Sequence, residues 1–505
     1  MRRVGSSAKS VAIRMDQMPT RRVWDVIVAG AGPAGLFAAL GIASASDQKV
    51  LLLDAGADIQ ERRGAALQAC DPLADGSEYL KGVGGAGLFS DGKLCLSLEV
   101  GGHLRATLSP EKKRWLVETI AKCFGAPPRY YDPSFKHTAE VSRLKQRASS
   151  LGLKFKHYPV FHIGTDKCRD VILALRGTLL RSGVELLPRC ELESLADASG
   201  GGITAQVVLD SKRCQLTCRN MVLALGKVGA SNQARLCQSL GVGSTSRPLY
   251  IGLRLETSSR SLAPLFKGTK DPKYSMEFPD GSKIKTHCAS NGGQVLLLRY
   301  EGLPLAGGHG FRNLQTGRSS LSILWDIRGE REPYLFATNL MARVASHTEG
   351  LLLAQRAEDY LAGVPSSEIH LSQMALSNRL CRPGNVRDFL PREYFNRLDC
   401  FLQRLLRIVP DLLGKETVFY APSIEWWMDQ IDVESENMET ARSGLYVCGD
   451  GSGWSQGIVH AAATGLLAAE GIAGKALCGD SHVVGTIAAI VDASISSFAL
   501  PVEGG

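Results

Sequence analysis

The first hydrophobic run of the chain is Val23–Ala29, which predicts a buried strand. A glycine-rich turn follows it, and the Ala- and Leu-rich segment Pro33–Ser44 predicts a helix. A second apolar run, Lys49–Asp54, predicts another buried strand. A strand, a helix and a strand within about 32 residues form a βαβ unit, whose two strands lie in a parallel sheet.

The remaining chain mixes helical and strand patterns. Asp166–Ser182 and Asn396–Val409 predict amphipathic helices, because their apolar residues recur at helical spacing. Residues 250–335 hold short alternating segments separated by Gly and Pro turns, a texture typical of an antiparallel sheet. Further elements are predicted at Val184–Leu187, Thr204–Leu209, Cys214–Cys218, Met221–Leu225, Gly444–Cys448 and Gly457–Gly474.

Positive charge is concentrated at the N-terminus. The 505 residues carry a formal net charge of +8, of which +5 lies in residues 1–22. The nearly neutral remainder is not typical of a nucleic-acid-binding protein, so we expect no nucleic-acid partner. The Arg-rich first 22 residues predict a basic flexible tail, read either as a disordered N-terminus or as an organelle transit peptide. We expect a cytoplasmic protein, with an organelle as the alternative.

The spacing of the cysteines and the hydropathy of the chain argue against further classes of protein. The 13 Cys residues are scattered and no CxxC occurs, which favours buried thiols in a reducing compartment over a disulfide framework or a zinc site. We therefore expect no metal. No apolar run reaches the roughly 18–20 residues of a membrane helix, so we expect no membrane span. The oligomeric state and the role of the C-terminal tail, residues 476–505, stay open.

The turn after the first strand matches GxGxxG, the pattern of a dinucleotide-binding loop. The first glycine permits a tight turn, the second lets the backbone approach a pyrophosphate, and the third lets helix and strand pack closely. The helix N-terminus supplies free N–H groups to the phosphates. Asp54 ends the next strand, where a carboxylate can accept hydrogen bonds from an adenosine ribose. The predicted contacts are Gly30, Ala31, Gly32, Pro33, Ala34, Gly35, Asp54 and Ala55.

Two later segments favour FAD over NAD as the dinucleotide. The apolar run Val222–Gly226 ends in a glycine that is expected to contact the cofactor. Near the C-terminus, Gly449 and Asp450 follow a strand, and Gly457 and Ile458 open a helix. A carboxylate there can hold a ribityl hydroxyl, which NAD lacks. A metal-binding loop is the weaker alternative, because it offers only one carboxylate.

A second GxGxxG match, Gly82–Gly87, lacks a preceding apolar strand. We therefore predict a loop that covers the flavin, with Ser90, Asp91 or Lys93 near its reactive side. The expected main-chain contacts of this loop are Gly84, Gly85, Ala86 and Gly87. No separate NAD(P)H-binding domain is evident, so NAD(P)H is expected at most as a diffusible electron donor.

Four segments together resemble the FAD-dependent dehydrogenase family of the glutathione-reductase-like flavoproteins, many of which are uncharacterised. They are Gly84–Leu94, His162–Asp166, Pro422–Glu425 and Asp450–Gly465. The resemblance implies noncovalent FAD and a substrate domain inserted between the second and third cofactor segments. It implies no particular substrate.

The predicted fold is α/β: a Rossmann-like FAD-binding domain, with a parallel sheet in ββα layers, interrupted by an α+β substrate domain with an antiparallel sheet. The predicted limits are 23–250 and 416–475 for the FAD-binding parts and 251–415 for the substrate domain.

Candidate catalytic residues are few. His287 and Cys288 could serve as an acid/base or thiol pair, but neighbours on a strand point to opposite faces, so at most one is expected to face the flavin. A buried Cys and a hydrogen-bonded structural His are the alternative reading. Four arginines could bind a carboxylate or lie on the surface: Arg254, Arg379, Arg382 and Arg387. An aromatic pocket could be formed by Tyr420, Trp426, Trp427 and Trp454, although core packing is the expected role for at least half of them.

The sequence thus predicts an FAD-dependent oxidoreductase that moves a hydride or two electrons between bound FAD and a small organic substrate. One alternative is an NAD(P)H-driven reductase of a carbon–carbon double bond or a flavin monooxygenase. A second alternative is a flavin-binding regulator without catalysis, which a protein without a substrate-sized pocket would favour.

Overall fold

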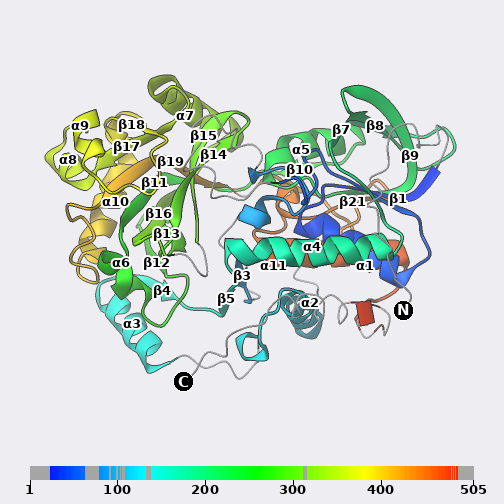
Figure 1. Ribbon diagram of the computed structural model, residues 1–505, viewed down its shortest axis with the longest axis horizontal. Coiled ribbons are helices and arrows are strands. Elements are labelled where there is room, and N and C mark those ends of the chain that lie inside the picture. The colour runs from blue at the N-terminus through cyan, green and yellow to red at the C-terminus, as the bar shows by residue number, and fades with distance from the viewer. Residues whose placement is uncertain are drawn as a thin grey trace, which may run out of the picture.

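The computed structural model describes residues 23–62, 79–89, 92–97, 100–102, 104, 108–131, 138–310, 315–426, 428–478, 480, 483 and 485–486. Two sheets form two halves of the molecule, which lie side by side in Figure 1. The predicted N-terminal tail, residues 1–22, and the predicted flavin contacts Ser90 and Asp91 lie outside the described residues.

The first half is built on a seven-stranded sheet with the order β6-β2-β1-β9-β8-β7, in which β21 also pairs with β9. β6, β2, β1, β9 and β21 run parallel, while β7, β8 and β9 form an antiparallel meander. The strands are β1 (Val23–Ala29), β2 (Val50–Leu53), β6 (Glu185–Leu187), β7 (Cys190–Asp197), β8 (Ile203–Leu209), β9 (Lys212–Leu223) and β21 (Leu445–Val447).

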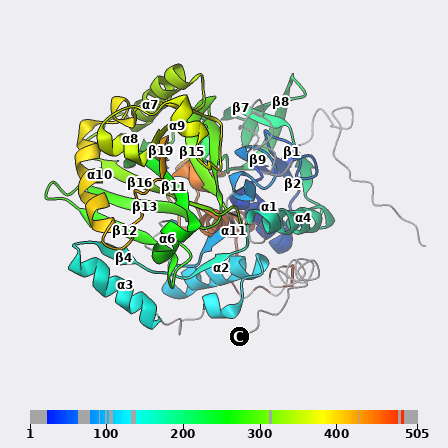
Figure 2. The same cartoon turned by 60° about the vertical axis from the view of Figure 1, so that its left-hand side comes forward.

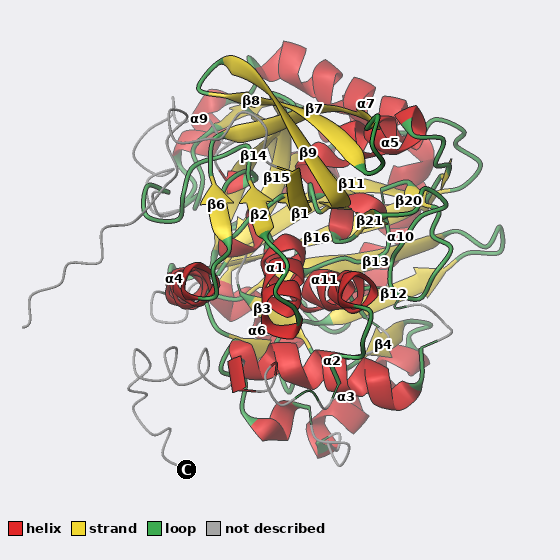
Figure 3. Ribbon diagram, turned by 90° about the vertical axis from the view of Figure 1, so that its right-hand side faces the viewer, coloured by secondary structure: helices red, strands yellow, loops and turns green. Residues whose placement is uncertain are grey.

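Helices cover one face of this sheet. Successive residues of its strands point alternately into two apolar cores, one on each face. Val26 and Val28 pack into the core shared with α1, α4 and α11, whereas Ile27 and Ala29 pack toward α5 and the meander. Figure 3 shows α1, α4 and α11 together beneath the sheet. The helices of this half are α1 (Pro33–Ala45), α2 (Pro110–Cys123), α4 (Thr165–Arg181), α5 (Ala230–Ser239) and α11 (Ile458–Ala473).

The second half is built on an eight-stranded sheet with the order β18-β17-β19-β11-β16-β13-β12-β4. All its pairs are antiparallel except β17 with β18. The strands are β4 (Lys154–Lys156), β11 (Leu249–Ser258), β12 (Lys273–Glu277), β13 (Lys283–Ser290), β16 (Arg318–Ile327), β17 (Leu352–Arg356), β18 (Cys381–Pro383) and β19 (Val418–Trp426).

The two faces of this second sheet differ in polarity. Leu253 and Ile323 belong to an apolar core shared with α6, α7 and α10, which cover this face in Figure 2. The alternate positions, such as Arg254 and Ser322, point to the opposite face. The helices here are α3 (Ala139–Ser150), α6 (Ser259–Phe266), α7 (Pro333–Thr348), α8 (Ala357–Ala362), α9 (Glu368–Ser372) and α10 (Arg392–Leu405).

Three two-stranded sheets complete the fold. They consist of β3 (Lys93–Cys95) with β5 (Val160–His162), β10 (Ser244–Thr245) with β20 (Gln430–Ile431), and β14 (Gln294–Tyr300) with β15 (Leu303–His309). The chain therefore has an α/β fold with a Rossmann-like parallel core and antiparallel sheets, as the sequence predicts. None of the helices in the described part of the chain is both long and apolar enough to cross a membrane.

Several predicted boundaries differ from the structure. The predicted strands Cys214–Cys218 and Met221–Leu225 are one strand, β9, because its first part pairs with β8 and its last part with β1. α10 begins at Arg392 and ends at Leu405, four residues before the predicted end. A proline disfavours helical geometry in the residue before it, and Pro410 directly follows the predicted end of this helix.

The second sheet also extends beyond residues 251–415. β4 precedes that range, and β19 follows it. β19 pairs with β11 from Trp426 opposite Leu249 to Val418 opposite Glu256, so its main-chain hydrogen bonds belong to the antiparallel sheet. The chain re-enters the parallel sheet only at β21.

Candidate functional site

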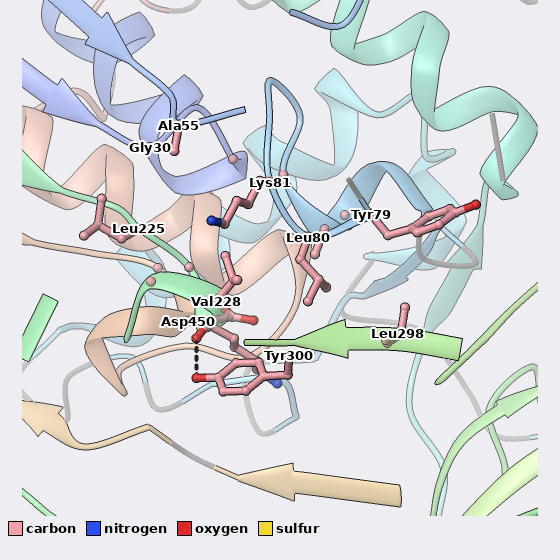
Figure 4. Close-up of a pocket in the computed structure, with 18 of the residues that line it drawn as sticks. Gly30, Ala55, Tyr79, Leu80, Lys81, Leu225, Val228, Leu298, Tyr300 and Asp450 are labelled. Atoms are coloured by element: carbon pink, nitrogen blue, oxygen red, sulfur yellow. Dashed lines mark hydrogen bonds between the residues drawn. The ribbon is translucent and has the colours of Figure 1, made fainter. Parts of the chain in front are cut away.

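One cavity of about 1480 Å³ is lined by residues of both halves. Drug-sized ligands usually occupy roughly 300–1,000 Å³, so this cavity has room for a ligand larger than a drug-sized molecule. Figure 4 shows how Gly30 and Ala55 of the first half and Leu298 and Tyr300 of the second half surround it. The predicted residues that line it are Gly30, Gly32, Pro33, Ala34, Asp54, Ala55, Gly85, Ala86, Gly87, Lys93, Gly226, His287, Cys288, Gly449, Asp450, Gly457 and Ile458. The predicted residues Ala31, Gly35 and Gly84 are not among its lining residues.

The turn between β1 and α1 depends on glycine at two positions. Gly30 has φ +103°, and a Cβ there would lie 2.2 Å from the Ala224 carbonyl oxygen. A Cβ at Gly35 would lie 1.7 Å from the Gly30 carbonyl oxygen. Any side chain at either position would therefore force the turn apart.

Gly32 has a different surrounding. Its φ of −74° suits any residue, and a Cβ there would meet only the Gly85 Cα, at 3.8 Å. Because Gly32 lines the cavity, a side chain at this position would occupy the cavity itself. Here glycine keeps the main chain accessible to a ligand.

The N-termini of two helices reach the cavity. α1 begins after Gly32 and α11 after Gly457, and neither has a side-chain cap. Ala34 and Ile458, in the first turns of these helices, line the cavity. Uncapped first-turn N–H groups and the helix dipole favour an anionic group at such a position.

Asp54 connects three segments beside the α1 turn. Its carboxylate accepts hydrogen bonds of 2.8 Å each from the main-chain N–H groups of Ala31, Gly56 and Gly82. A carboxylate has about four acceptor sites, so one remains for a ligand hydroxyl. Asp54 therefore organises the loops in addition to any contact with a ribose.

The Gly84–Gly87 segment lies against the first glycine turn. The Gly84 N–H donates to the Ala31 carbonyl at 2.8 Å. A Cβ at Gly85 would come within 2.9 Å of the Gly32 Cα, and one at Gly87 within 3.2 Å of Ile458. The segment thus lies between the turn before α1 and the start of α11.

Arg62, which sequence reasoning missed, holds this segment in place. It is buried and donates to the carbonyl oxygens of Gly82, Val83 and Gly85 at 3.2, 2.8 and 3.1 Å. Its guanidinium also lies over the Phe89 ring, 4.8 Å from the centroid. No sequence motif marks this role, because these three partners are main-chain carbonyls.

Asp450 follows β21 and faces the start of α11. Its Oδ1 accepts hydrogen bonds from the Ser455 hydroxyl at 2.9 Å and from the Gly457 N–H at 3.2 Å. Burial raises the pKa of its carboxyl. Gly226 lies next to this loop, since a Cβ at Gly451 would lie 2.4 Å from the Gly226 carbonyl oxygen.

His287 and Cys288 both line the cavity, which corrects the expectation that at most one would face it. The reason is a bulge in β13. The register with β16 shifts between His287 and Ser290, and Cys288 has φ +47°. A bulge redirects a side chain that regular alternation would send to the other face.

His287, which is partly exposed, forms a group with two charged side chains. Its Nδ1 lies 3.2 Å from Glu425 Oε2, and the Lys285 ammonium lies 2.6 Å from the same oxygen. The negative charge of the Glu425 carboxylate favours the neutral tautomer with the proton on Nδ1, which leaves Nε2 as the acceptor.

The surroundings fix the charge states of this pair. Burial lowers the pKa of His287 well below its usual range, although Glu425 opposes the shift. Burial alone would raise the pKa of the Glu425 carboxyl, but His287 and Lys285 hold it well below its usual range. At neutral pH the histidine is therefore neutral and the glutamate ionised.

Lys93 connects the two halves at the cavity. Its ammonium donates to the Ala289 carbonyl and lies 3.7 Å from Asp271 Oδ1. Asp271 is also paired with Lys273 at 3.1 Å and accepts a hydrogen bond from the Tyr158 hydroxyl. These cations hold the pKa of the Asp271 carboxyl well below its usual range against the opposing effect of burial.

The candidate arginines separate clearly in the structure. Arg254 lines the cavity. Arg382 pairs with Glu349 and Arg387 with Asp399, while Arg379 donates to the carbonyl oxygens of Leu371 and Met374. Arg254 is thus the one of the four whose position suits a ligand.

The two described side chains of the predicted aromatic pocket, Tyr420 and Trp454, do not line the cavity. Tyr420 is buried against Glu256, and the Trp454 indole donates to the Ile431 carbonyl. Trp427 and the side chain of Trp426 lie outside the described residues. The aromatic residues that line the cavity are Tyr79, Phe89 and Tyr300. The Tyr300 hydroxyl donates to the Lys227 carbonyl at 3.0 Å, the dashed line in Figure 4.

Comparisons with known proteins give distant similarities. No protein-family model matches the chain. An uncharacterised protein of Clostridium beijerinckii is 24% identical over 490 residues, which cover 89% of this chain and 80% of that protein.

Solved structures are similar at a comparable distance. Glycine oxidase from Geobacillus kaustophilus shares 13% identity with a TM-score of 0.38, over 91% of this chain and 97% of that one. NikD, an amino acid oxidase of nikkomycin biosynthesis, shares 11% with a TM-score of 0.40, over 92% and 97%. A flavoprotein/dehydrogenase from Cytophaga hutchinsonii shares 11% with a TM-score of 0.37, over 92% and 82%. TM-scores at this level do not establish a shared fold, so what this chain binds is inferred from its own residues.

Proposed function

We propose that this chain is an FAD-dependent oxidoreductase that moves a hydride or two electrons between bound FAD and a small organic substrate. The observation that carries this proposal is the cavity that residues of both halves line. It joins the glycine turns and helix N-termini of the first half to the polar sheet face of the second half, where His287 lies. Its volume of about 1480 Å³ exceeds the roughly 300–1,000 Å³ that a single drug-sized ligand usually occupies.

The residues present fit FAD. The open main chain at Gly32 and Gly457 and the first turns of α1 and α11 suit a pyrophosphate. Asp54 retains one acceptor site for a ribose hydroxyl, and Asp450 faces the cavity where a ribityl hydroxyl would need a partner. The segment Gly85–Gly87 would lie along the ring. The finer assignment to the glutathione-reductase-like dehydrogenases stays a prediction.

FAD, when bound, supplies two-electron oxidation or reduction. The chain supplies a proton acceptor: His287 is neutral, its Nδ1 lies 3.2 Å from Glu425 Oε2, and its Nε2 can accept a proton from a substrate. Glu425 fixes the tautomer and stabilises the imidazolium that forms. Residues of β13, β16 and β19 position these groups, so the substrate would lie against the antiparallel sheet.

The direction of electron flow separates the main proposal from its alternative. In a dehydrogenase or oxidase the substrate reduces FAD, whereas in a reductase or monooxygenase NAD(P)H does so. The size of the cavity favours an enzyme over a flavin-binding regulator without catalysis.

Anaerobic absorption spectroscopy of the purified protein tests the proposal. We expect a noncovalent flavin spectrum, present on purification or after reconstitution with FAD, that neither NADH nor NADPH bleaches quickly. Free FAD mixed with the same nucleotides is the control. Rapid bleaching would establish the NAD(P)H-driven alternative, and absence of any bound flavin would overturn the proposal.

A further inference from the structure

Arg254 is a buried cation without an acidic partner. It lies on β11, and 1% of its surface is exposed. Its N–H groups donate to the Ser320 hydroxyl at 3.1 and 2.9 Å, to the Ser322 hydroxyl at 3.4 Å and to the Cys288 carbonyl at 3.1 Å. Among the described residues no carboxylate lies within ion-pair distance of it. A guanidinium has five N–H donors, so at least one is left for another acceptor.

Two other buried arginines of the chain have an acidic partner. Arg176 pairs with Asp58 at 2.5 Å, and Arg318 pairs with Glu256 at 3.0 Å. Burying a charge without a counter-ion is costly, and proteins usually meet this cost with a paired charge. The unpaired charge of Arg254 therefore needs an explanation that its neutral hydrogen bonds do not provide.

Arg254 forms part of the cavity wall. Arg254, Ser322 and Cys288 all line the cavity, and so does Gly308. A Cβ at Gly308 would lie 1.9 Å from Arg254 Nη2, so the guanidinium keeps its position only because residue 308 is glycine. The acidic residues of this sheet face have other partners: Glu256, two residues from Arg254 on β11, is paired with Arg318, and Glu425 is paired with Lys285 and His287.

Arg254 and the proton acceptor His287 have a fixed relation. Ser322 on β16 is the register partner of Arg254 on one side and of His287 on the other. Directly opposed residues of an antiparallel pair point to the same face. Since neighbouring strands lie about 4.8 Å apart, the two backbone positions are about 10 Å apart. A small molecule can contact both side chains at once.

We infer that the substrate of this site is a small organic acid whose carboxylate pairs with Arg254 while its reacting part lies toward His287. The inference rests on the proposed function for the reaction, but the anion site itself does not require FAD. The remaining N–H of Arg254 can donate a charge-assisted hydrogen bond to a carboxylate oxygen, and the positive charge favours an acid over a neutral analogue of the same shape.

Isothermal titration calorimetry tests the inference with matched pairs of probes: benzoate with benzamide, acetate with acetamide, and indole-3-acetate with its amide. Each member of a pair has nearly the same shape, and only the acid is charged at pH 7.5. We expect at least one acid to bind the FAD-loaded protein at least about 30-fold more tightly than its amide. Arg254→Gln should abolish this preference, and Arg254→Lys should restore only part of it.

Arg379→Gln is the matched control, because Arg379 also donates to carbonyl oxygens but does not line the cavity. It should leave the preference unchanged. A structural role of Arg254, as a clamp on the Cys288 bulge, would lower the thermal midpoint of Arg254→Gln without changing the ratio of acid to amide affinity.

Equal affinities for acid and amide across all three pairs would overturn the inference. The same titrations on FAD-free protein separate the two proposals. Acid selectivity without FAD binding would refute the proposed function and keep the anion site, whereas FAD binding without acid selectivity would do the reverse.

Discussion

The two halves of the cavity are built in different ways. In the first half the main chain makes the site: glycines close the turns, and helix N-termini face the cavity. In the second half side chains make the site, since Arg254, His287 and Glu425 project from one face of an antiparallel sheet. A main-chain site suits a part that any dinucleotide shares, while a side-chain site can be specific for one substrate.

The two halves also differ in how far apart their site residues lie along the chain. The first glycine turn is complete within residues 30–35, and Gly30 packs against Ala224, directly after β9. The polar face of the second half is assembled from β11, β13, β16 and β19, which are separated by up to 160 residues along the chain. Substitutions should therefore act differently in the two halves: through space around the main chain in the first, and through charge in the second.

Gly32→Val should have the largest effect, on FAD affinity. Its φ of −74° suits valine, but the side chain would occupy the cavity where the pyrophosphate would lie. Loss of two charge-assisted hydrogen bonds corresponds to about 3–6 kcal/mol, or a more than 100-fold rise in the Kd for FAD. Fluorescence titration with FAD measures this. A thermal midpoint equal to that of the wild type shows that the fold is intact, and unchanged FAD affinity would contradict the main-chain site.

Gly35→Ala should destabilise the fold itself. Its Cβ would lie 1.7 Å from the Gly30 carbonyl oxygen, so we expect a loss of about 3 kcal/mol in the free energy of unfolding, at the upper end of usual overpacking costs. Urea denaturation measures it. Gly177→Ala, also within a helix but facing only the flexible Arg181 side chain, should instead gain up to about 1 kcal/mol. Equal effects at both positions would refute the steric explanation.

Asp54→Asn should destabilise the FAD-free protein by about 2 kcal/mol, because hydrogen bonds to a charged acceptor contribute about 1.5–3 kcal/mol. Asn has one acceptor oxygen in place of two, and its NH2 group cannot accept from the N–H groups that Asp54 now binds. Asp25→Asn is the control, since Asp25 accepts only one main-chain hydrogen bond, from exposed Lys49. It should change the free energy of unfolding by no more than about 0.5 kcal/mol. If the two variants are equally stable, Asp54 does not organise the loops.

His287 should stay neutral, and so reactive, at a pH where an ordinary histidine is protonated. Burial lowers its pKa well below 6.5, so the neutral form persists as pH falls from 8 to 6. We expect the rate at which diethyl pyrocarbonate modifies His287 to stay constant over this range. N-acetylhistidine in the same tube, with a pKa near 6.5, should lose reactivity. Peptide mass spectrometry measures both, and a parallel decline would contradict the assignment of His287 as a neutral base.

Cys288→Gly should have the smallest effect. Cys288 adopts a left-handed φ of +47°, which glycine adopts without strain, so the free energy of unfolding should rise by up to about 1 kcal/mol. Cys400→Gly, within α10, should lower it by about 1 kcal/mol. Chemical denaturation of both variants checks the opposite signs, and a loss at both positions would show that the bulge is not strained.

The sequence predicts the first half better than the second. β1 has the predicted bounds and α1 ends within one residue of them, because the apolar runs are continuous and glycine and proline mark their ends. The division of β9 was predicted wrongly, since no local signal shows that one long strand serves two neighbours.

In the second half the sequence names His287 but not its partner. Glu425 lies 138 residues further along the chain and comes beside His287 only through the pairing of β11 with β16 and β19. The bulge at Cys288 also leaves no local signature. Arg254 can be recognised as a candidate anion-binding residue only from the structure, in which no described carboxylate lies within ion-pair distance of it.

A crystal structure of the protein grown with FAD tests the central claim most directly. We predict the pyrophosphate at the first turns of α1 and α11, the adenosine ribose beside Asp54, and the ring between Gly85–Gly87 and the sheet face that carries His287. FAD bound outside this cavity, or with its ring directed away from His287, would contradict the account.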